Sequence, residues 1–326
     1  MYTHKMGFLI LLISGTMMTI SSPSWFSAWI GLEVNLLSFI PLIKNKDNTL
    51  SSESMIKYFI TQALGSMIVI FSIITMHISP NVSMMLNMGL FLKLGAAPLH
   101  SWFPEVMAGL DWTSALLLMT WQKIAPMVLI MYSTGDKYIT SVFIIASSMM
   151  GGLLGLNQTN LRKILAYSSI NHIGWMLAAL TNSWTVWTTY FLAYSLINMT
   201  IIYILKNFKM SSINQMIKMK SSPMISSMTT MNILSLGGLP PFLGFLPKWL
   251  TITLMTHNNL PFLTIPLIVF TLMSLFYYLR MTFNCLMMIT ESSVMSTKPK
   301  MNFILMVNNF ILLSSLLMTP VLILIF

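Results

Sequence analysis

Long apolar runs, separated by short polar or turn segments, dominate the pattern of hydrophobic and polar positions. We count eleven runs long enough to cross a lipid bilayer as helices, and such a helix needs about 20 mostly apolar residues. Their approximate limits are 6–21, 25–43, 56–78, 82–99, 112–133, 139–157, 164–181, 184–205, 226–256, 261–285 and 302–325. The runs do not alternate as the strands of a membrane β-barrel do. The pattern therefore predicts an all-α integral membrane protein, with residues 1–326 forming one polytopic domain.

The first and the ninth run depart from the pattern of a plain membrane helix. The first 25 residues resemble a secretory signal peptide, but they have no clear cleavage site and further runs follow. We therefore predict that they form the first membrane helix. The ninth run contains the stretch GGLPPFLGFLP. Proline inside a helix removes a backbone donor and clashes with the preceding turn, so the ninth helix is predicted to be broken.

Composition excludes a soluble protein and several kinds of site. Only 7% of the residues are charged and 56% are hydrophobic, whereas soluble domains carry about 25% charged residues. The net charge of +10 is spread between the apolar runs, so we expect no nucleic-acid partner. Cys285 is the only cysteine, and no nucleotide-binding glycine motif occurs. We therefore expect no redox centre or other cofactor in this chain.

The basic residues between the runs sort onto one side of the predicted bundle. If the N-terminus lies on side A, twelve basic residues fall on that side and only Lys137 falls on side B. The twelve are Lys5, Lys44, Lys46, Lys57, Arg162, Lys163, Lys206, Lys209, Lys218, Lys220, Lys298 and Lys300. Because basic loops mark the inner face of a membrane protein, the N-terminus is predicted to face that compartment and Phe326 the opposite one.

Four charged residues inside the runs cannot be assigned to loops or interfaces: Glu33, Lys93, Lys123 and Lys248. Counted along a helix, Glu33 is roughly 12 Å and Lys123 roughly 16 Å from the start of its run. An ionised side chain at mid-membrane depth costs roughly 2.5–3.5 kcal/mol on insertion scales, and such residues are functional candidates for that reason. We therefore interpret these four residues as the candidate functional site.

Each of the four also has a purely structural interpretation. Lys93, near the end of its run, could extend to the membrane interface. Lys123 could form an ion pair with Glu33, and Glu33 could serve only as that partner. Lys248 could lie at an interface if the ninth run ends early, at Pro247. The sequence leaves these alternatives open.

Helix-breaking residues accompany two of the lysines. Pro98 follows Lys93 by five residues, and a cluster of glycines and prolines precedes Lys248. Broken helices at corresponding positions of two halves are typical of transporters built from inverted repeats. The pattern predicts two inverted five-helix repeats, about 6–133 and 139–285, with broken fourth and ninth helices and a C-terminal span over 302–325.

Lysine chemistry at these positions suits a proton path. Burial favours the neutral amine and a nearby carboxylate favours the ammonium, so a lysine whose carboxylate moves away can release a proton. Glu33, Lys93 and Lys123 come from nearby runs, where water could link them. His172, central to the seventh run, is a candidate relay. A hydrogen-bonded core histidine is the alternative.

Five stretches of the chain resemble the antiporter-like membrane subunits of respiratory complex I, mitochondrial NADH:ubiquinone oxidoreductase. Among these the stretches are most similar to the subunit 2 family in its short animal form. They are WIGLEVNLLSFIPL, KLGAAPLHSWFPEV, MTWQKIAP, GGLLGLNQTNLRKILAYSSINHIGWML and LSLGGLPPFLGFLPKW, in order between about Trp25 and Arg280. The resemblance implies a proton-translocating subunit with two inverted repeats, similar to subunits of cation/proton antiporters.

The resemblance also implies which residues act and which partners they need. Glu33, Lys93, Lys123 and Lys248 match the charged residues that the family uses to move protons. NADH, FMN, iron–sulfur clusters and ubiquinone are then expected in partner subunits of the enzyme. Other membrane-arm subunits and lipid, with cardiolipin as a candidate, are the expected partners, and the chain is not expected to exist alone.

In this family side A corresponds to the matrix of the mitochondrion. The resemblance therefore implies an inner-membrane protein with its N-terminus in the matrix and its C-terminus in the intermembrane space. No transit peptide is evident, which we expect of a protein made inside the organelle. Two rival interpretations remain: a subunit of a cation/proton antiporter, and a structural scaffold of the membrane arm whose charges only join helices.

Overall fold

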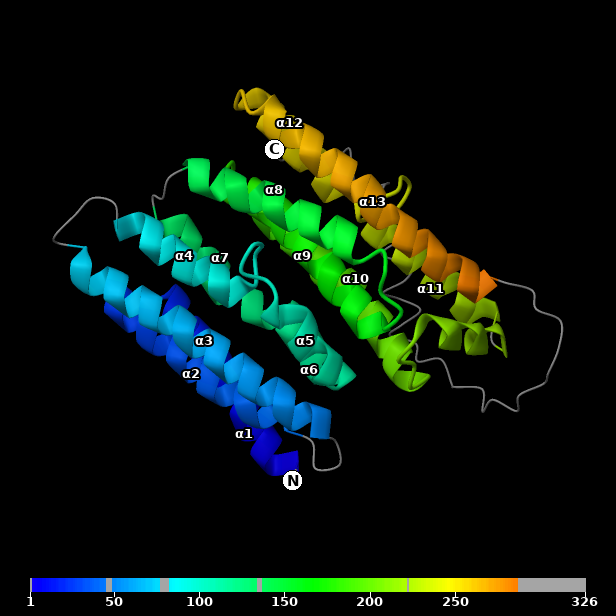
Figure 1. Cartoon of the computed structure of the whole chain (residues 1–326), viewed down its shortest axis with the longest axis horizontal. Helices are drawn as coiled ribbons and strands as arrows, with labels where there is room; N and C mark the ends of the chain where they lie inside the picture. Colours follow the sequence, from blue (N-terminus) through cyan, green and yellow to red (C-terminus); the bar gives the residue numbers. More distant parts are fainter. Residues whose placement is uncertain (1, 45–48, 77–81, 134–136, 222, 287–326) are drawn as a thin grey trace. The chain divides into compact units, whose positions relative to one another are not determined.

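A computed structural model describes residues 2–44, 49–76, 82–133, 137–221 and 223–286 of the chain (Figure 1). The predicted eleventh span, 302–325, lies outside these ranges, as do Lys46, Lys298 and Lys300. Within the described ranges the structure is helical and contains no strand beyond an isolated bridge between Asn160 and Ser212.

The helices have the following bounds. They are α1 (Tyr2–Ile20), α2 (Trp25–Ile43), α3 (Thr49–Thr75), α4 (Val82–Leu94), α5 (Trp102–Gly109), α6 (Trp112–Met119), α7 (Trp121–Tyr132), α8 (Lys137–Leu154), α9 (Leu161–Leu180), α10 (Trp184–Asn207), the 3₁₀-helix η1 (Ile213–Ser221), α11 (Pro223–Gly237), α12 (Phe245–His257) and α13 (Pro261–Leu286).

The chain forms two compact units, which divide between Met150 and Gly151 inside α8. In the first unit α1 packs on α2, α2 on α3, and α3 on both α4 and α5, while α7 contacts α1 and α4. In the second unit α9 contacts α10, α12 and α13, and α11 packs against α10 and α13. Each unit therefore has its own helical core.

Apolar composition makes several of these helices suitable for a membrane. Five segments of the described chain are long and apolar enough to cross a bilayer: α2, α3, α6 together with α7, α10 and α13. Apolar parts of α1, α4 and α8 are shorter. Helix α9 is more polar, but almost all of its residues are buried. Because protein and not lipid surrounds α9, it can carry polar residues such as Asn171 and His172 at little cost.

The predicted bounds of the unbroken helices agree with the structure to differing degrees. Helix α2 matches the predicted range 25–43, whereas α3 begins at Thr49, seven residues before the predicted start at 56. The early start depends on tertiary packing. Ser51 and Ser54 are buried, and a side chain at Gly109 of α5 would collide with the backbone of Leu50 and the side chain of Ser54.

The fourth and the ninth apolar run are both broken, as predicted. In the first unit α4 ends at Leu94 and α5 begins at Trp102, and in the second unit α11 ends at Gly237 and α12 begins at Phe245. Gly95 has φ +73° and Gly238 has φ +77°, and the third residue after each glycine is a cis proline. Left-handed backbone of this kind favours glycine.

The two breaks also have the same pattern of backbone hydrogen bonds. The N–H of Gly95 donates to the carbonyl of Leu92, and the next N–H donates to the carbonyl of Phe91. In the second unit Gly238 donates to Ser235, and the next N–H donates to Leu234. This is the Schellman arrangement, which satisfies the last carbonyls of a helix. Both following helices begin seven residues after the glycine.

The fifth run differs from its prediction as one continuous helix over 112–133. It is interrupted at Thr120, where α6 ends and α7 begins. The hydroxyl of Thr120 donates to the carbonyl of Leu116 at 2.7 Å, and such back-bonding by threonine bends helices. Pro126 within α7 adds a position without a backbone donor.

Candidate functional site

The structure places the sequence-predicted site residues in both units. Lys93 lies in the last turn of α4, Lys123 in the first turn of α7 and Lys248 in the first turn of α12. Glu33 lies within α2 and His172 within α9. Each buried lysine is therefore next to a helix interruption, where backbone groups are available to polar partners.

Glu33 and Lys93 form an ion pair in the first unit. Nζ of Lys93 lies 3.8 Å from Oε1 of Glu33, and the two side chains are 3% and 26% exposed, respectively. Gly65 of α3 makes room for the lysine stem, since a Cβ atom there would lie 2.9 Å from Cγ of Lys93. Lys93 therefore points into the protein and does not extend to a membrane interface. The sequence had suggested Lys123 as the partner of Glu33.

Lys93 and Lys123 line the same small cavity. It has room for at least one water molecule. The polar side chains of its wall, apart from the two lysines, are Asn35, Tyr58, Gln62, Trp102 and Gln122. Lys123 is almost wholly buried, and its Nζ lies 5.9 Å from the centroid of the Phe103 ring, within cation–π range. A water molecule in this cavity would have polar partners on several sides.

Hydrogen bonds hold the polar wall of this cavity in place. The hydroxyl of Tyr58 donates to Oε1 of Gln122 at 3.4 Å, and Nε2 of Gln122 donates to Oδ1 of Asn35 at 2.9 Å. Nε2 of Gln62 donates to the backbone carbonyl of Lys93 at 3.1 Å. Sequence reasoning missed these neutral residues, although amides inside apolar runs are themselves a signal for a buried polar path.

Lys248 is held differently from Lys93. Its Nζ donates to the backbone carbonyl of Gly237 at 2.9 Å and approaches that of Leu236 at 3.5 Å. These carbonyls end α11, where the helix dipole favours a positive charge. The ring of Trp175 also lies below the ammonium, with its centroid 5.9 Å from Nζ. The side chain is buried, so Lys248 does not lie at an interface of the described chain.

His172 lies in a second small cavity of the second unit. Its Nδ1 is 2.9 Å from the hydroxyl of Tyr190, and the Tyr194 ring packs against it with centroids 5.0 Å apart. The wall of the cavity also includes Ser235 of α11 and Pro247 of α12. His172 therefore faces the break that carries Lys248, as a relay would, and it is also hydrogen bonded, as a core histidine would be.

The two broken helices carry their lysines at different positions. Lys93 precedes Gly95 by two residues, whereas Lys248 follows Gly238 by ten. In the first unit the residue ten positions after the glycine is Glu105. The two breaks thus have similar backbone geometry, but Lys93 lies before its interruption and Lys248 lies after its own.

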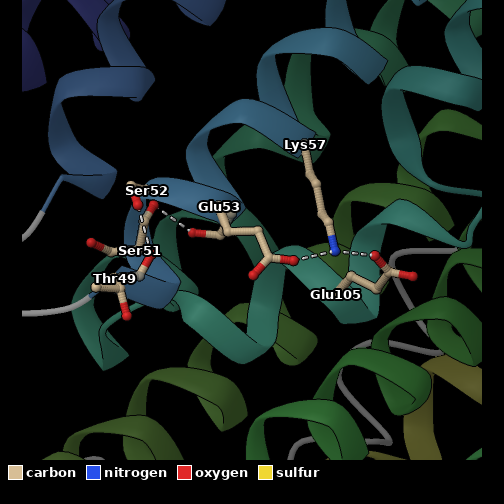
Figure 2. Close-up of polar contacts among 7 residues, drawn as sticks. Thr49, Ser51, Ser52, Glu53, Lys57 and Glu105 are labelled. Carbon is tan, nitrogen blue, oxygen red and sulfur yellow. Dashed lines mark hydrogen bonds and ion pairs between the residues drawn. The ribbon is translucent and has the colours of Figure 1, made fainter.

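Glu105 belongs to an exposed ion network that the sequence did not suggest (Figure 2). Nζ of Lys57 lies 2.7 Å from a carboxylate oxygen of Glu53 and 2.7 Å from one of Glu105, so it joins α3 to α5. All three side chains are more than a third exposed. Because water screens such pairs, we assign this network no part in the buried site.

Nowhere in the described ranges do three His, Cys, Asp or Glu side chains gather closely enough to hold a metal ion. The charged residues of the site instead form one ion pair and one helix-end contact, and two small cavities lie beside them. Such an arrangement can store and pass protons.

The chain is similar to proteins of known identity. The model of the family described as NADH:quinone oxidoreductase/Mrp antiporter, TM, matches residues 22–83 and 78–276. A protein of Anopheles gambiae named NADH-ubiquinone oxidoreductase chain 2 is 47% identical over 95% of each chain. The protein of the same name from Locusta migratoria is 41% identical, covering 93% of this chain and 92% of its own.

Solved structures have the same fold at low sequence identity. A chain of respiratory complex I from Thermus thermophilus matches with a TM-score of 0.88 and 21% identity, covering 97% of this chain and 78% of that one. A chain of the Mrp complex from Dietzia matches with a TM-score of 0.77 and 15% identity, covering 85% of this chain and 59% of that one.

Proposed function

Because the chain belongs to the NADH:quinone oxidoreductase and Mrp antiporter transmembrane family, we propose that it is the proton-translocating subunit 2 of respiratory complex I. In this role it moves protons across the membrane while partner subunits pass electrons from NADH to ubiquinone. Relatives named NADH-ubiquinone oxidoreductase chain 2 support the assignment, since the match extends over nearly the whole of both chains.

The rival role, a subunit of a cation/proton antiporter, has weaker support. The match to the Mrp chain covers 59% of that chain at 15% identity, whereas the match to the Anopheles relative covers 95% at 47% identity. The two roles share a fold, and they differ in whether proton movement is coupled to electron transfer.

A single observation carries the mechanism: buried Lys93 pairs with the partly exposed carboxylate of Glu33 and lines a polar cavity that Lys123 also lines. When Lys93 passes a proton to water in the cavity, Lys93 becomes neutral and Glu33 loses its counter-charge. When Lys123 receives that proton, the positive charge moves from one helix interruption to the next. Changes in the Glu33–Lys93 distance would therefore change the free energy of proton transfer.

Lys248 and His172 form the corresponding part of the path in the second unit. The ammonium of Lys248 is stabilised by fixed carbonyls of α11, and His172 shares a cavity with the neighbouring break. An imidazole hydrogen bonded to a tyrosine hydroxyl can accept a proton on one nitrogen and release another from the second. The roles of these residues, like those of the first unit, are part of the proposal.

The similar backbone geometry of the two breaks supports two inverted five-helix repeats, about 6–133 and 139–285, within eleven membrane spans. Positive Gly φ values, Schellman bonds and equal spacing to the next helix recur in both. With an odd number of helices in each repeat, the two repeats would have opposite orientations. The excess of basic loops on one side supports a matrix N-terminus and an intermembrane-space C-terminus in the mitochondrial inner membrane.

Partner subunits hold the redox chemistry in this proposal. FMN and iron–sulfur clusters would lie outside this chain, and ubiquinone would be reduced at a site formed by other subunits. Other membrane-arm subunits are therefore its partners, and lipid, with cardiolipin as a candidate, would cover the remaining apolar surface.

Isolation of the assembled complex tests this function. We expect an affinity-tagged chain, extracted in mild detergent, to copurify with subunits that contain flavin and iron–sulfur clusters, and the preparation to oxidise NADH with quinone. In sealed vesicles whose outer face carries the basic loops, the reaction should move protons from the medium into the vesicle. Copurification with antiporter subunits alone, without flavin or iron, would contradict the proposal.

A further inference from the structure

The last carbonyls of α4, next to Lys93, accept hydrogen bonds from two neutral side chains that the proposed mechanism has not used. Nε2 of Gln62 donates to the carbonyl of Lys93 at 3.1 Å, and Nε1 of Trp102 donates to the carbonyl of Leu92 at 3.1 Å. Gln62 and Trp102 are both buried, each with 6% of its surface exposed. Because carbonyls at a buried helix end need donors from outside the helix, these two side chains complete the end of α4.

Gln62 and Gly65 contact Lys93 from the same face of α3. They are three residues apart, which places them on one side of the helix. Gln62 bonds to the backbone of Lys93, and its amide nitrogen must face that carbonyl, because a carbonyl oxygen only accepts. A Cβ atom at Gly65 would lie 2.9 Å from Cγ of Lys93, so the glycine leaves space for the lysine stem. Helix α3 therefore holds both the backbone and the side chain of Lys93.

In the second unit the lysine itself bonds to the corresponding carbonyl. Leu236 precedes the left-handed glycine of its break by two residues, as Lys93 does in the first unit. Nζ of Lys248 lies 3.5 Å from the carbonyl oxygen of Leu236 and 2.9 Å from that of Gly237. The amide of Gln62 thus takes, in the first unit, the place that an ammonium takes in the second.

The ion pair of Lys93 is sensitive to small changes in the position of the lysine. Nζ lies 3.8 Å from Oε1 of Glu33, whereas a direct ammonium–carboxylate hydrogen bond is about 2.7–2.9 Å long. A lysine near the C-terminus of a helix can instead donate to the last carbonyls of that helix, where the dipole also favours its charge. Carbonyls that already have neutral donors compete less for the ammonium.

We propose that Gln62 and Trp102 are positioning residues for proton transfer at Lys93. By supplying neutral donors to the end of α4, they leave the ammonium of Lys93 to Glu33 and to the polar cavity. Neither residue takes up or releases a proton in this role. The inference rests on the proposed function. It also accounts for the different surroundings of the two lysines, since Lys248 serves the end of its own broken helix.

The test uses the assembled complex with Gln62→Met and, separately, with Trp102→Phe. The first change keeps the length of the side chain and removes the donor, and the second keeps an aromatic ring without its N–H. Thr61→Val is the control for the first, because the Thr61 hydroxyl donates to carbonyls within α3. Trp184→Phe, at a residue that is 47% exposed, is the control for the second. We expect both variants to assemble and to pump severalfold fewer protons per NADH, and both controls to equal the natural complex.

A purely structural role of these hydrogen bonds would give a different result. It would lower the amount of complex on a native gel and leave normal pumping per NADH in the complex that remains. That result would overturn the proposal, as would failure of both variants to assemble. If only one variant assembles, its pumping decides the outcome.

A map of the Gln62→Met complex provides the second measurement. We expect Nζ of Lys93 to have moved from Glu33 toward the carbonyls at the end of α4, and an unchanged ion pair would contradict the proposal. The proposed function and this inference can fail separately. If assembled Lys93→Met and Lys123→Met complexes pump fully, the proposed function fails. If those complexes lose pumping while the Gln62 and Trp102 variants pump fully, only the positioning role is wrong.

Discussion

The ammonium of Lys248 donates a hydrogen bond of 2.9 Å to the backbone carbonyl of Gly237, the last residue of α11. This contact ties a buried positive charge to the negative end of a broken helix. Lys93, at the other break, has a carboxylate partner instead, at 3.8 Å. A carboxylate can move or take up a proton, whereas a helix end does neither. The two lysines are therefore suited to different tasks in one path.

Gly238→Ala should disturb Lys248 through the backbone. Gly238 has φ +77°, and an added Cβ would lie 2.7 Å from Nζ of Lys248. The left-handed conformation alone costs a residue with a side chain roughly 1–2 kcal/mol, and the clash would move the ammonium away from Gly237. We expect less assembled complex on a native gel and lower pumping in what remains.

Gly237→Ala is the matched control for that change. The nearest atom to its added Cβ is 3.6 Å away, an ordinary contact. We expect abundance and pumping close to those of the natural complex. Equal defects in both variants would mean that the contact with Lys248 is unimportant.

Glu33→Gln should reduce pumping because it removes the counter-charge of Lys93. Removing one partner of a buried ion pair lowers the free energy of unfolding by roughly 3–5 kcal/mol. We expect a loss of stability of about 2–3 kcal/mol here, because 26% of the Glu33 side chain is exposed and Lys93 can remain neutral. The measurement is proton uptake per NADH in vesicles, with thermal stability of the complex beside it.

Glu53→Gln makes the same substitution in a shorter ion pair. Its carboxylate lies 2.7 Å from Lys57, but both side chains are exposed, so water already screens them. We expect no measurable change in pumping. A larger defect at Glu53 than at Glu33 would show that distance, and not burial, decides which pair matters.

The sequence predicted the helix breaks and the buried charges but not how the charges are paired. Glycine and proline act locally, so the interruptions near Lys93 and Lys248 could be found from spacing. The partner of Glu33 depends on how α2, α3 and α4 pack, and no local pattern encodes that packing.

The same distinction explains the errors in helix bounds. The first residues of α3 include serines and Glu53, which are typical of a loop between membrane helices. Packing on α5 nevertheless keeps them helical. The interruption at Thr120 could not be predicted from the sequence, because the bond from its hydroxyl to the carbonyl of Leu116 forms only in the folded chain. The polar wall around Gln122 could not be predicted from charge alone, because its amide side chains are neutral.

The predicted topology can be tested with intact and inverted membranes. We expect Lys5, Lys44 and the segment 206–220 to react with a membrane-impermeant amine reagent only from the matrix side, and a tag after Phe326 to be accessible only from the intermembrane space. The reason is the excess of basic loops on one side. Labelling of 206–220 from the intermembrane space would contradict the count of eleven spans.

The most direct test of the account is the number of protons pumped per NADH by the assembled complex with Lys123→Met. Methionine keeps the length of the unbranched side chain and replaces the ammonium by an apolar group, so insertion should be easier by roughly 2–3 kcal/mol and the complex should assemble. The account predicts a large loss of pumping, with no rescue by Lys123→Arg, because guanidinium does not release its proton. Lys206→Met, an exposed lysine at the end of α10, should pump normally. Full pumping by an assembled Lys123→Met complex would contradict the claim that Lys123 carries protons.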